Sequence, residues 1–545
     1  MPIEELKTAI KRAAKKLFDS EIEPQLSRPE EKFGDYAANA ALQLAKSSSK
    51  APHEIARALA DELKDLPGVA QISIAGPGFI NIRLEDSTLF NAATGAVQSS
   101  KPLAGQEVLV EFGDPNPFKE MHIGHLYSYI VGDAIASLLE NQGADVKRLS
   151  YHGDVGRHVA MAIYGLRHME QAEGDRDYLG AAYSYGYERF DQDPQAKTEI
   201  EKINQSVYSR DDPAINETHE RGVKLSFEYF DKILNKLSIS NDKRYFESQA
   251  TPVGMKMVEE NVGKVFIRSQ GAVVYEGEKA GLHTRVFITS KNLPTYETKD
   301  LGLVKLKDRD FPEAVRSIVI TANEQTEYFK VMLAALKEID TGLAKKTVHL
   351  SHGFVNLSTG KMSSRTGDVY AAGDLISEVE QAVRTAFPES EPDSQTALAA
   401  LKYDFLKPRL GGNITFDVNE SISLEGNSGP YIQYAHARAA SILAKAKNGS
   451  AESRIQNPEL DPAERSLARK ISEYPEVLQK ASDELMPHHI CTYLYELAQG
   501  FNRFYETSRI IGDEREQLRL SLARSYQQVL KSGLGILNIA APNHL

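Results

Sequence analysis

The sequence predicts an α/β protein in which a doubly wound, Rossmann-like parallel sheet carries an insertion, a small α+β domain precedes the sheet, and an all-α helical bundle follows it. Apolar, strand-like runs that alternate with helical patterns and end in polar residues indicate the sheet; they cover residues 107–112, 146–154, 314–325 and 346–357. Further along the chain, apolar residues step by four and three, as in helices; they are Ile490, Leu494, Leu497, Phe501 and Phe504. Ligands of such sheets bind at the carboxyl ends of the strands, so the polar strand ends are the first place to look for a site.

The order of these patterns divides the chain into predicted domains. Residues 1–102 form the first, in which alternation and a Gly-Pro-Gly turn at 69–84 predict two strands. The sheet domain spans 103–385, interrupted by a charged, Tyr-rich insertion at about 155–290. A connecting stem at 386–424 and the helical domain at 425–545 complete the prediction.

Composition restricts the class of protein. The 545 residues are 41% hydrophobic and 26% charged, with no apolar run near the ~20 residues that a membrane span needs, so we expect no membrane contact. The basic run at 6–18 lacks the apolar core of a signal peptide, and the single cysteine, Cys491, excludes an internal disulfide and multi-cysteine zinc sites. A cytoplasmic, monomeric protein is expected. The net charge of −12 argues against a general nucleic-acid coat but permits local basic strips.

The segment "NPFKEMHIGHLYSYIVGD" (116–133) reads as a loop that enters a helix. The apolar positions Leu126, Ile130, Ala134 and Leu138 recur every four residues, which places the helix start at the histidines. A helix start presents unpaired N–H groups and positive dipole charge, so it can receive phosphate oxygens. His122 and His125 lie three apart on the first turn, and Gly124 leaves the backbone open to close approach. Two packing histidines beside a helix cap are the alternative.

A second loop, "STGKMSSRTGD" (358–368), combines glycines and small hydroxyl residues with the cations Lys361 and Arg365. Loops of this kind can wrap a polyphosphate with backbone N–H groups while a lysine neutralises developing charge. Taken alone, the loop is equally well explained as a solvated basic turn.

Together the two loops resemble the paired signatures of class I aminoacyl-tRNA synthetases, and three further segments in matching order resemble the arginyl-tRNA synthetase family; they are residues 33–46, 76–84 and 425–443. The resemblance implies an arginine–tRNA ligase that activates arginine with ATP, releases pyrophosphate, and transfers the arginyl group to the 3′-terminal adenosine of tRNA(Arg). ATP with Mg²⁺ would be a substrate, and tRNA(Arg), ATP and L-arginine would be the partners.

The resemblance also implies roles for residues of the two loops. His122 and His125 would contact the phosphates, and Gly124 would lie under the adenine. Ser364 stands where the family usually has a lysine, so Lys119, or alternatively Arg365, would supply the missing cation. The implied catalytic set is His122, His125, Lys119 and Lys361, and the implied ATP-binding set is Gly124, Met362, Ser363, Ser364 and Arg365.

An arginine pocket needs acceptors for a guanidinium. Tyr296 and Asp300 are four apart, which places them on one helical face, and the Asp300 carboxylate can take two guanidinium N–H groups. An ordinary amphipathic surface would give the same spacing. The resemblance assigns this pair to arginine binding, together with Gln325, Glu111 and Asn116.

Two other functions remain open from the sequence. A nucleotidyltransferase that acts without tRNA could share the histidine loop, but it leaves the helical domain unexplained. A catalytically inactive, synthetase-like tRNA-binding protein is the alternative from a binding class. No protein-bound metal is expected, because the pairs His349–His352 and His488–His489 lack a neighbouring zinc-type pattern of cysteines or carboxylates.

Overall fold

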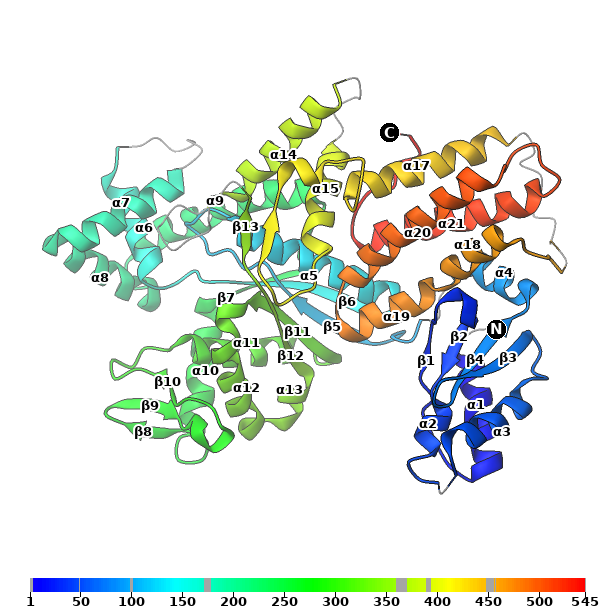
Figure 1. Ribbon diagram of the computed structural model, residues 1–545. Coiled ribbons are helices and arrows are strands. Elements are labelled where there is room, and N and C mark those ends of the chain that lie inside the picture. The colour runs from blue at the N-terminus through cyan, green and yellow to red at the C-terminus, as the bar shows by residue number, and fades with distance from the viewer. Residues whose placement is uncertain are drawn as a thin grey trace.

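A five-stranded, all-parallel sheet lies at the centre of the molecule (Figure 1). The computed structural model describes residues 3–48, 50–98, 101–170, 178–358, 370–388, 394–446, 455 and 457–544. The strands are β5 (Glu107–Glu111), β6 (Asp145–His152), β7 (Lys243–Phe246), β11 (Ala314–Ala322) and β12 (Thr347–His352). Their order is β12-β11-β5-β6-β7, so the chain reverses direction across the sheet between β5 and β11. This confirms the doubly wound fold and puts its ligand-binding crevice at that reversal.

The stretch predicted as one insertion, 155–290, contains a strand of the central sheet. β7 is only four residues long and reads "KRYF", which lacks a recognisable apolar alternation. Four helices precede it: α6 (Arg157–His168), α7 (Tyr178–Gln192), α8 (Pro194–Ser209) and α9 (Pro213–Leu237). After β7 come α10 (Glu247–Glu260) and a small antiparallel sheet of β8 (Ile267–Ser269), β9 (Ala272–Tyr275) and β10 (Arg285–Ile288). The interruption is therefore two separate pieces on either side of β7 and α10.

Helices connect the strands of the central sheet. α5 (Ile123–Asn141) joins β5 to β6, and its buried positions include Leu126, Ile130, Ala134 and Leu138, as the four-residue spacing predicts. α6 to α9 join β6 to β7, and α10 and α11 (Tyr296–Asp310) lie between β7 and β11. α12 (Thr326–Ile339) and α13 (Thr341–Lys346) join β11 to β12. A parallel pair, β13 (Val355–Leu357) and β14 (Ile414–Phe416), follows the sheet, with α14 (Ala372–Ala386), α15 (Ser394–Leu406) and α16 (Val418–Ser421).

The two ends of the chain form an α+β domain and a helical bundle. The first contains α1 (Ile3–Phe18), α2 (Ala40–Leu44), α3 (Pro52–Leu63) and α4 (Asp86–Thr94) against the antiparallel sheet β1-β2-β4-β3. Its strands are β1 (Leu26–Ser27), β2 (Tyr36–Ala38), β3 (Val69–Ala75) and β4 (Phe79–Leu84), so the pair predicted at 69–84 is confirmed. The bundle comprises α17 (Gly429–Lys445), α18 (Pro462–Ser472), α19 (Tyr474–Glu484), α20 (His488–Thr507) and α21 (Glu516–Ile536).

The N-terminal domain lies against the helical bundle, beside α18 (Figure 1). Arg465 of α18 is 4% exposed and pairs with the carboxylates of Asp35, at 2.6 Å, and Asp86. A second bridge joins Arg28 to Glu476 at 2.6 Å. Removing one partner of a buried ion pair is strongly destabilising, so these contacts fix the two domains relative to each other.

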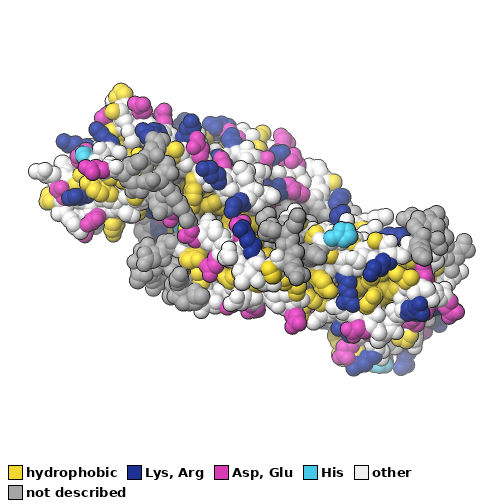
Figure 2. All heavy atoms as spheres, turned by 90° about the horizontal axis from the view of Figure 1, so that it is seen from above, with side chains coloured by type: hydrophobic (Ala, Val, Ile, Leu, Met, Phe, Trp, Pro, Cys, Tyr) yellow, Lys and Arg dark blue, Asp and Glu magenta, His cyan; other side chains and the backbone are white. Residues whose placement is uncertain are grey.

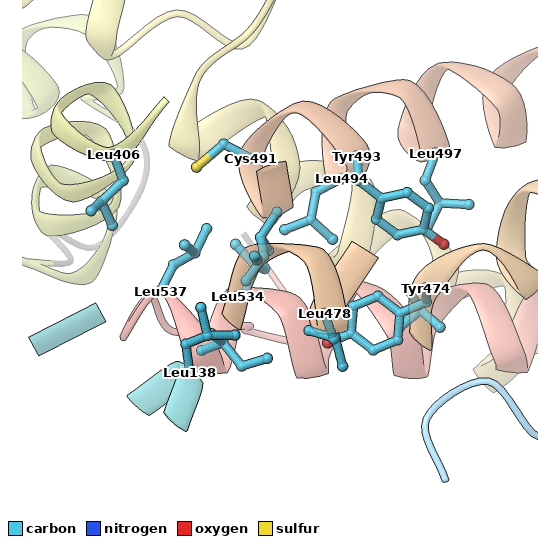
Figure 3. Packing of buried hydrophobic residues seen from close by; sticks show 14 of the residues in the cluster. Leu138, Leu406, Tyr474, Leu478, Cys491, Tyr493, Leu494, Leu497, Leu534 and Leu537 are labelled. Carbon is cyan, nitrogen blue, oxygen red and sulfur yellow. The ribbon is translucent and has the colours of Figure 1, made fainter. Parts of the chain in front are cut away.

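The core of the helical bundle continues into the sheet domain. Leu138 of α5 and Leu406 of α15 lie in the same buried cluster as bundle leucines (Figure 3); these include Leu478, Leu494 and Leu534. Full burial of a leucine side chain contributes about 1.5–3 kcal/mol, so this shared core strongly favours contact between the two domains.

A buried polar junction lies at the same boundary. The Asp133 carboxylate of α5 accepts hydrogen bonds from Asn538 Nδ2 and, at 2.9 Å, from Arg148 Nε. Lys402 of α15 is 3% exposed and donates to the backbone oxygens of Leu237 and Asn538, each at 2.7 Å. Burial lowers the pKa of Lys402 to about 8. The helix that begins at the histidine pair is thus hydrogen-bonded to residues that follow α21.

Surface charges of both signs are mixed. On the face shown in Figure 2, basic and acidic side chains are interspersed along the length of the molecule. Within the described ranges, no helix is long and apolar enough to cross a membrane.

Candidate active site

A cavity of about 310 Å³ opens at the carboxyl ends of β5 and β11, where the chain reverses direction across the sheet. Eight residues predicted for the site line it: Glu111, Asn116, His122, Gly124, His125, Tyr296, Asp300 and Gln325. Segments far apart in the sequence therefore meet at the edge that the topology indicates.

The two histidines cap the helix that they begin. The Nδ1 atom of His122 accepts from the N–H groups of Gly124, at 3.1 Å, and His125, at 3.4 Å. In return, Nδ1 of His125 accepts from the His122 N–H at 3.2 Å. A neutral imidazole whose Nδ1 accepts carries its proton on Nε2. The cap therefore sets both rings as Nε2–H donors.

Both rings are neutral at pH 7. Burial, with a smaller contribution from Lys119, lowers the pKa of His122 to about 4, and burial lowers the pKa of His125 well below its usual value. The rings stack with centroids 3.6 Å apart. A Cβ at Gly124 would lie 3.0 Å from Cε1 of His122, so glycine at this position leaves the capping ring undisturbed. This helix start presents fixed, uncharged hydrogen-bond donors, the chemistry that suits phosphate oxygens.

The loop before His122 is held by the helical insertion. Phe118 has a left-handed backbone (φ +67°), and its N–H donates to Ser226 Oγ of α9 at 2.8 Å. Its buried ring packs on Gly222, where a Cβ would come within 2.0 Å of it. Lys119 is absent from the cavity lining; its Nζ lies 4.8 Å from the centre of the Tyr183 ring. α9 thereby fixes a strained loop whose next residue is Lys119.

The carboxylate of Asp300 lies in the same cavity as the two histidines. It is 7% exposed, and the Tyr328 hydroxyl donates to its Oδ2 at 2.8 Å. Burial raises the pKa of Asp300 to about 8. Tyr296, one turn earlier on α11, is 67% exposed at the cavity mouth. Asp300 and Tyr296 therefore do line the same cavity, Asp300 buried and Tyr296 exposed to solvent.

Two neighbouring carboxylates already have cations. Glu111 pairs with Lys307 at 2.7 Å, and Glu247 pairs with Lys299. Among the ion pairs of the described residues, none involves Asp300. A buried carboxylate without a cation favours a cationic ligand, because such a ligand stabilises its ionised form.

Hydrogen bonds of Asn116 and His152 fix the loop between β5 and α5, which lines the cavity. Asn116 Oδ1 accepts from the Gly153 N–H at 2.8 Å, which leaves the Asn116 NH₂ group available as a donor. His152 contacts the Pro115 carbonyl at 2.7 Å and Ser150 Oγ at 2.8 Å, so it braces the loop that carries Asn116.

Three protein-family models match the chain in series. The arginyl tRNA synthetase N terminal domain matches residues 4–84, and the DALR anticodon binding domain matches residues 432–545. Between them, the catalytic domain of the class I (R) tRNA synthetases matches residues 88–401, more than half of the chain. The chain belongs to the arginyl-tRNA synthetase family.

Proteins of this family match over nearly the full length. The arginine–tRNA ligase of Bacteroides fragilis (strain YCH46) is 28% identical, with 100% of each chain covered, and that of a Synechococcus species is 33% identical, with 93% of each covered. The solved structure of Thermus thermophilus arginyl-tRNA synthetase matches with a TM-score of 0.86 and 27% identity over 100% of both chains. The resemblance read from the sequence is confirmed.

The second loop predicted for the site contributes five residues. Lys361, Met362, Ser363, Ser364 and Arg365 lie outside the described residues. The described chain resumes at Tyr370, whose carbonyl accepts from the Ile123 N–H at 3.0 Å, immediately beside His122. The roles proposed for the second loop stay predictions.

The structure adds site residues that sequence reasoning missed; they are Tyr151, His152, Lys307 and Tyr328. Tyr328 follows Gln325 by three residues, so helical spacing offered a signal for it. Lys307 is seven residues after Asp300, two turns along the same face of α11. His152 and Tyr151 had no comparable signal. His152 contacts the loop after β5, and Tyr151 packs against α11, so both contacts join segments far apart in the sequence.

Proposed function

We propose that the chain is an arginine–tRNA ligase that converts arginine and ATP to arginyl-adenylate and pyrophosphate, then transfers the arginyl group to the 3′-terminal adenosine of tRNA(Arg). The observation that carries this proposal is that one cavity is lined both by Asp300, a buried carboxylate that has no ion pair in the described part of the chain, and by His122 and His125 with their Nε2–H donors. The family match over all three domains supports it.

Activation is an in-line displacement at the α-phosphate of ATP. The carboxylate of arginine forms the new bond to phosphorus while the bond to the β-phosphate oxygen breaks, and pyrophosphate carries the electron pair away. His122 and His125 donate from Nε2 to phosphate oxygens, and the start of α5 adds its dipole. Mg²⁺ enters with ATP, held through phosphate oxygens and water. Catalysis is positioning and charge stabilisation, and it needs no protein nucleophile.

Arginine is recognised by charge and by shape. Its guanidinium places two N–H groups on the Asp300 carboxylate, in the bidentate geometry that arginine favours. Glu111, Asn116, Tyr296 and Gln325 form the rest of the proposed pocket wall. Lys119, or alternatively Arg365, supplies the cation that the second loop lacks at Ser364. The N-terminal and helical domains hold the tRNA, and the protein works in the cytoplasm as a monomer.

The deciding experiment is ATP–pyrophosphate exchange with each of the twenty amino acids, with and without total tRNA. Exchange with arginine, together with transfer of labelled arginine to tRNA, supports the ligase. Exchange with no amino acid while tRNA still binds favours the inactive tRNA-binding protein. Adenylate or cytidylate formation on a small molecule, independent of both arginine and tRNA, favours the nucleotidyltransferase.

Arginine affinity should rise with pH up to about 8. Asp300 binds a guanidinium only when ionised, and its pKa of about 8 leaves it largely protonated at pH 7. Below this pKa, each pH unit of increase should lower the Kd for arginine about tenfold, and binding should release a proton. Titration calorimetry in two buffers of different ionisation enthalpy measures both effects. A Kd that is constant from pH 6 to 8 contradicts this assignment.

Gly222→Ala should impair the activation of arginine, although residue 222 is not part of the cavity lining. The new methyl group would lie 2.0 Å from the Phe118 ring and would displace the loop that leads to Lys119 and His122. We expect arginine-dependent exchange to fall about tenfold or more in kcat, because misplaced catalytic groups lose their orientation. Gly535→Ala in α21 is the matched control, since its added Cβ has no described atom within 4 Å outside its chain neighbours and its own helix backbone. Equal activity of the two variants would remove α9 from the catalytic arrangement.

A further inference from the structure

Tyr151 places a hydroxyl group beside the arginine pocket. The residue is the seventh of the eight in β6, and its ring packs on a small apolar cluster between the sheet and α11 that includes Leu149 and Leu303. The same residue lines the active-site cavity. Packing of the ring on this cluster therefore holds the Tyr151 side chain in place beside the cavity.

This hydroxyl is buried and has no hydrogen-bond partner within the described part of the chain. The Tyr328 hydroxyl in the same cavity differs, because it donates to Asp300. Burial, followed by the charges of Asp300, Glu247 and Glu111 and a contribution from Tyr328, raises the pKa of Tyr151 well above its usual value. The hydroxyl thus stays protonated, close enough to three carboxylates to feel their charge but bonded to none. An unpaired buried polar atom is destabilising until a ligand pairs with it.

We propose that Tyr151 Oη accepts an N–H of the substrate guanidinium and is a further specificity-determining residue of this synthetase. A guanidinium has five N–H donors, of which the Asp300 carboxylate can take two, so the remainder need other acceptors within the cavity. The phenol oxygen offers a lone pair, and its own proton stays free for a neighbouring carboxylate. The proposal rests on the proposed function, because it names a contact to the same substrate.

The test is Tyr151→Phe, which keeps the ring and removes only the hydroxyl. We expect the KM for arginine in ATP–pyrophosphate exchange to rise about tenfold, with kcat and the KM for ATP within twofold of the unsubstituted protein. The melting temperature should be unchanged or higher, because no hydrogen bond is lost on substitution. Tyr526→Phe is the matched control, since its hydroxyl is also buried and finds no partner among the residues that the structure describes, but it belongs to α21 in the helical bundle.

Several outcomes overturn the proposal. An unchanged arginine KM in Tyr151→Phe, or an equal rise in Tyr526→Phe, shows that the hydroxyl does not contact arginine. A fall in kcat and melting temperature with KM preserved assigns Tyr151 a structural role. If the unsubstituted protein itself shows no arginine-dependent exchange, the proposed function fails first, so the two failures are distinguishable.

Discussion

Asp300→Asn should lower kcat/KM for arginine in ATP–pyrophosphate exchange about 10³-fold. Asparagine keeps the size of the side chain and can still accept from Tyr328, but it cannot ionise to pair with a guanidinium. Removing one partner of a buried, hydrogen-bonded charge pair costs about 2–5 kcal/mol, and about 4 kcal/mol corresponds to this loss of rate. Steady-state exchange at saturating ATP measures it.

The loss should be confined to arginine. We expect ATP binding to change less than twofold and the melting temperature to stay the same or rise, because Asp300 is a buried acid that forms no ion pair among the described residues. Asp308→Asn is the matched control: it lies on the same helix, and its carboxylate is partly exposed near Lys305, at 3.3 Å. Similar exchange rates for the two variants would remove Asp300 from the pocket.

His122→Asn should reduce kcat for adenylate formation about 10²-fold while preserving stability. The ring would have two functions, since Nδ1 caps the helix and Nε2 carries the proton that the proposed mechanism donates to phosphate. Asparagine is a good N-cap residue and replaces the first function, but its shorter side chain cannot reach the position of Nε2–H. Loss of one preorganised donor typically costs 10²–10³ in rate. Single-turnover adenylate formation isolates this step.

His122→Ala separates the two functions of the ring. It should lose the same catalytic factor and also about 1 kcal/mol of stability, the usual cost of removing a helix cap. Thermal melting of the three proteins, unsubstituted, His122→Asn and His122→Ala, gives the comparison. If His122→Asn keeps full activity, the histidine is only a cap, which was the simpler interpretation of the sequence.

The features predicted from the sequence are those that depend on local pattern. The four-residue spacing from Leu126 to Leu138 predicted α5, and it placed the helix start at the histidine pair. Apolar runs that alternate with helical patterns predicted four strands of the parallel sheet, and the cavity lies at the carboxyl ends of these strands. The i, i+4 spacing of Tyr296 and Asp300 predicted one face of α11, and both do line the cavity. These patterns depend only on the geometry of a single helix or strand, so the sequence can reveal them.

Features that depend on distant partners were not predictable in this way. Glu111 and Lys307 are 196 residues apart in sequence, and neither residue type announces a buried pair. The ring nitrogen that donates in His122 is decided by a reciprocal backbone contact rather than by residue identity. β7 was absorbed into a predicted insertion because four residues are too few for a periodic signal.

The polar junction around Asp133, Lys402 and Asn538 limits how this synthetase can be re-engineered. A chimera that exchanges the helical bundle for that of a relative, cut near residue 425, would separate Asn538 from Asp133, Ser137 and Lys402. Asp133 would keep Arg148 and Lys402 would keep the Leu237 carbonyl, but each buried charge would lose one of its native hydrogen-bond partners. Successful grafts must carry matching residues at positions 133 and 402, so a bundle cannot be exchanged without part of the helix that begins at His122 and His125.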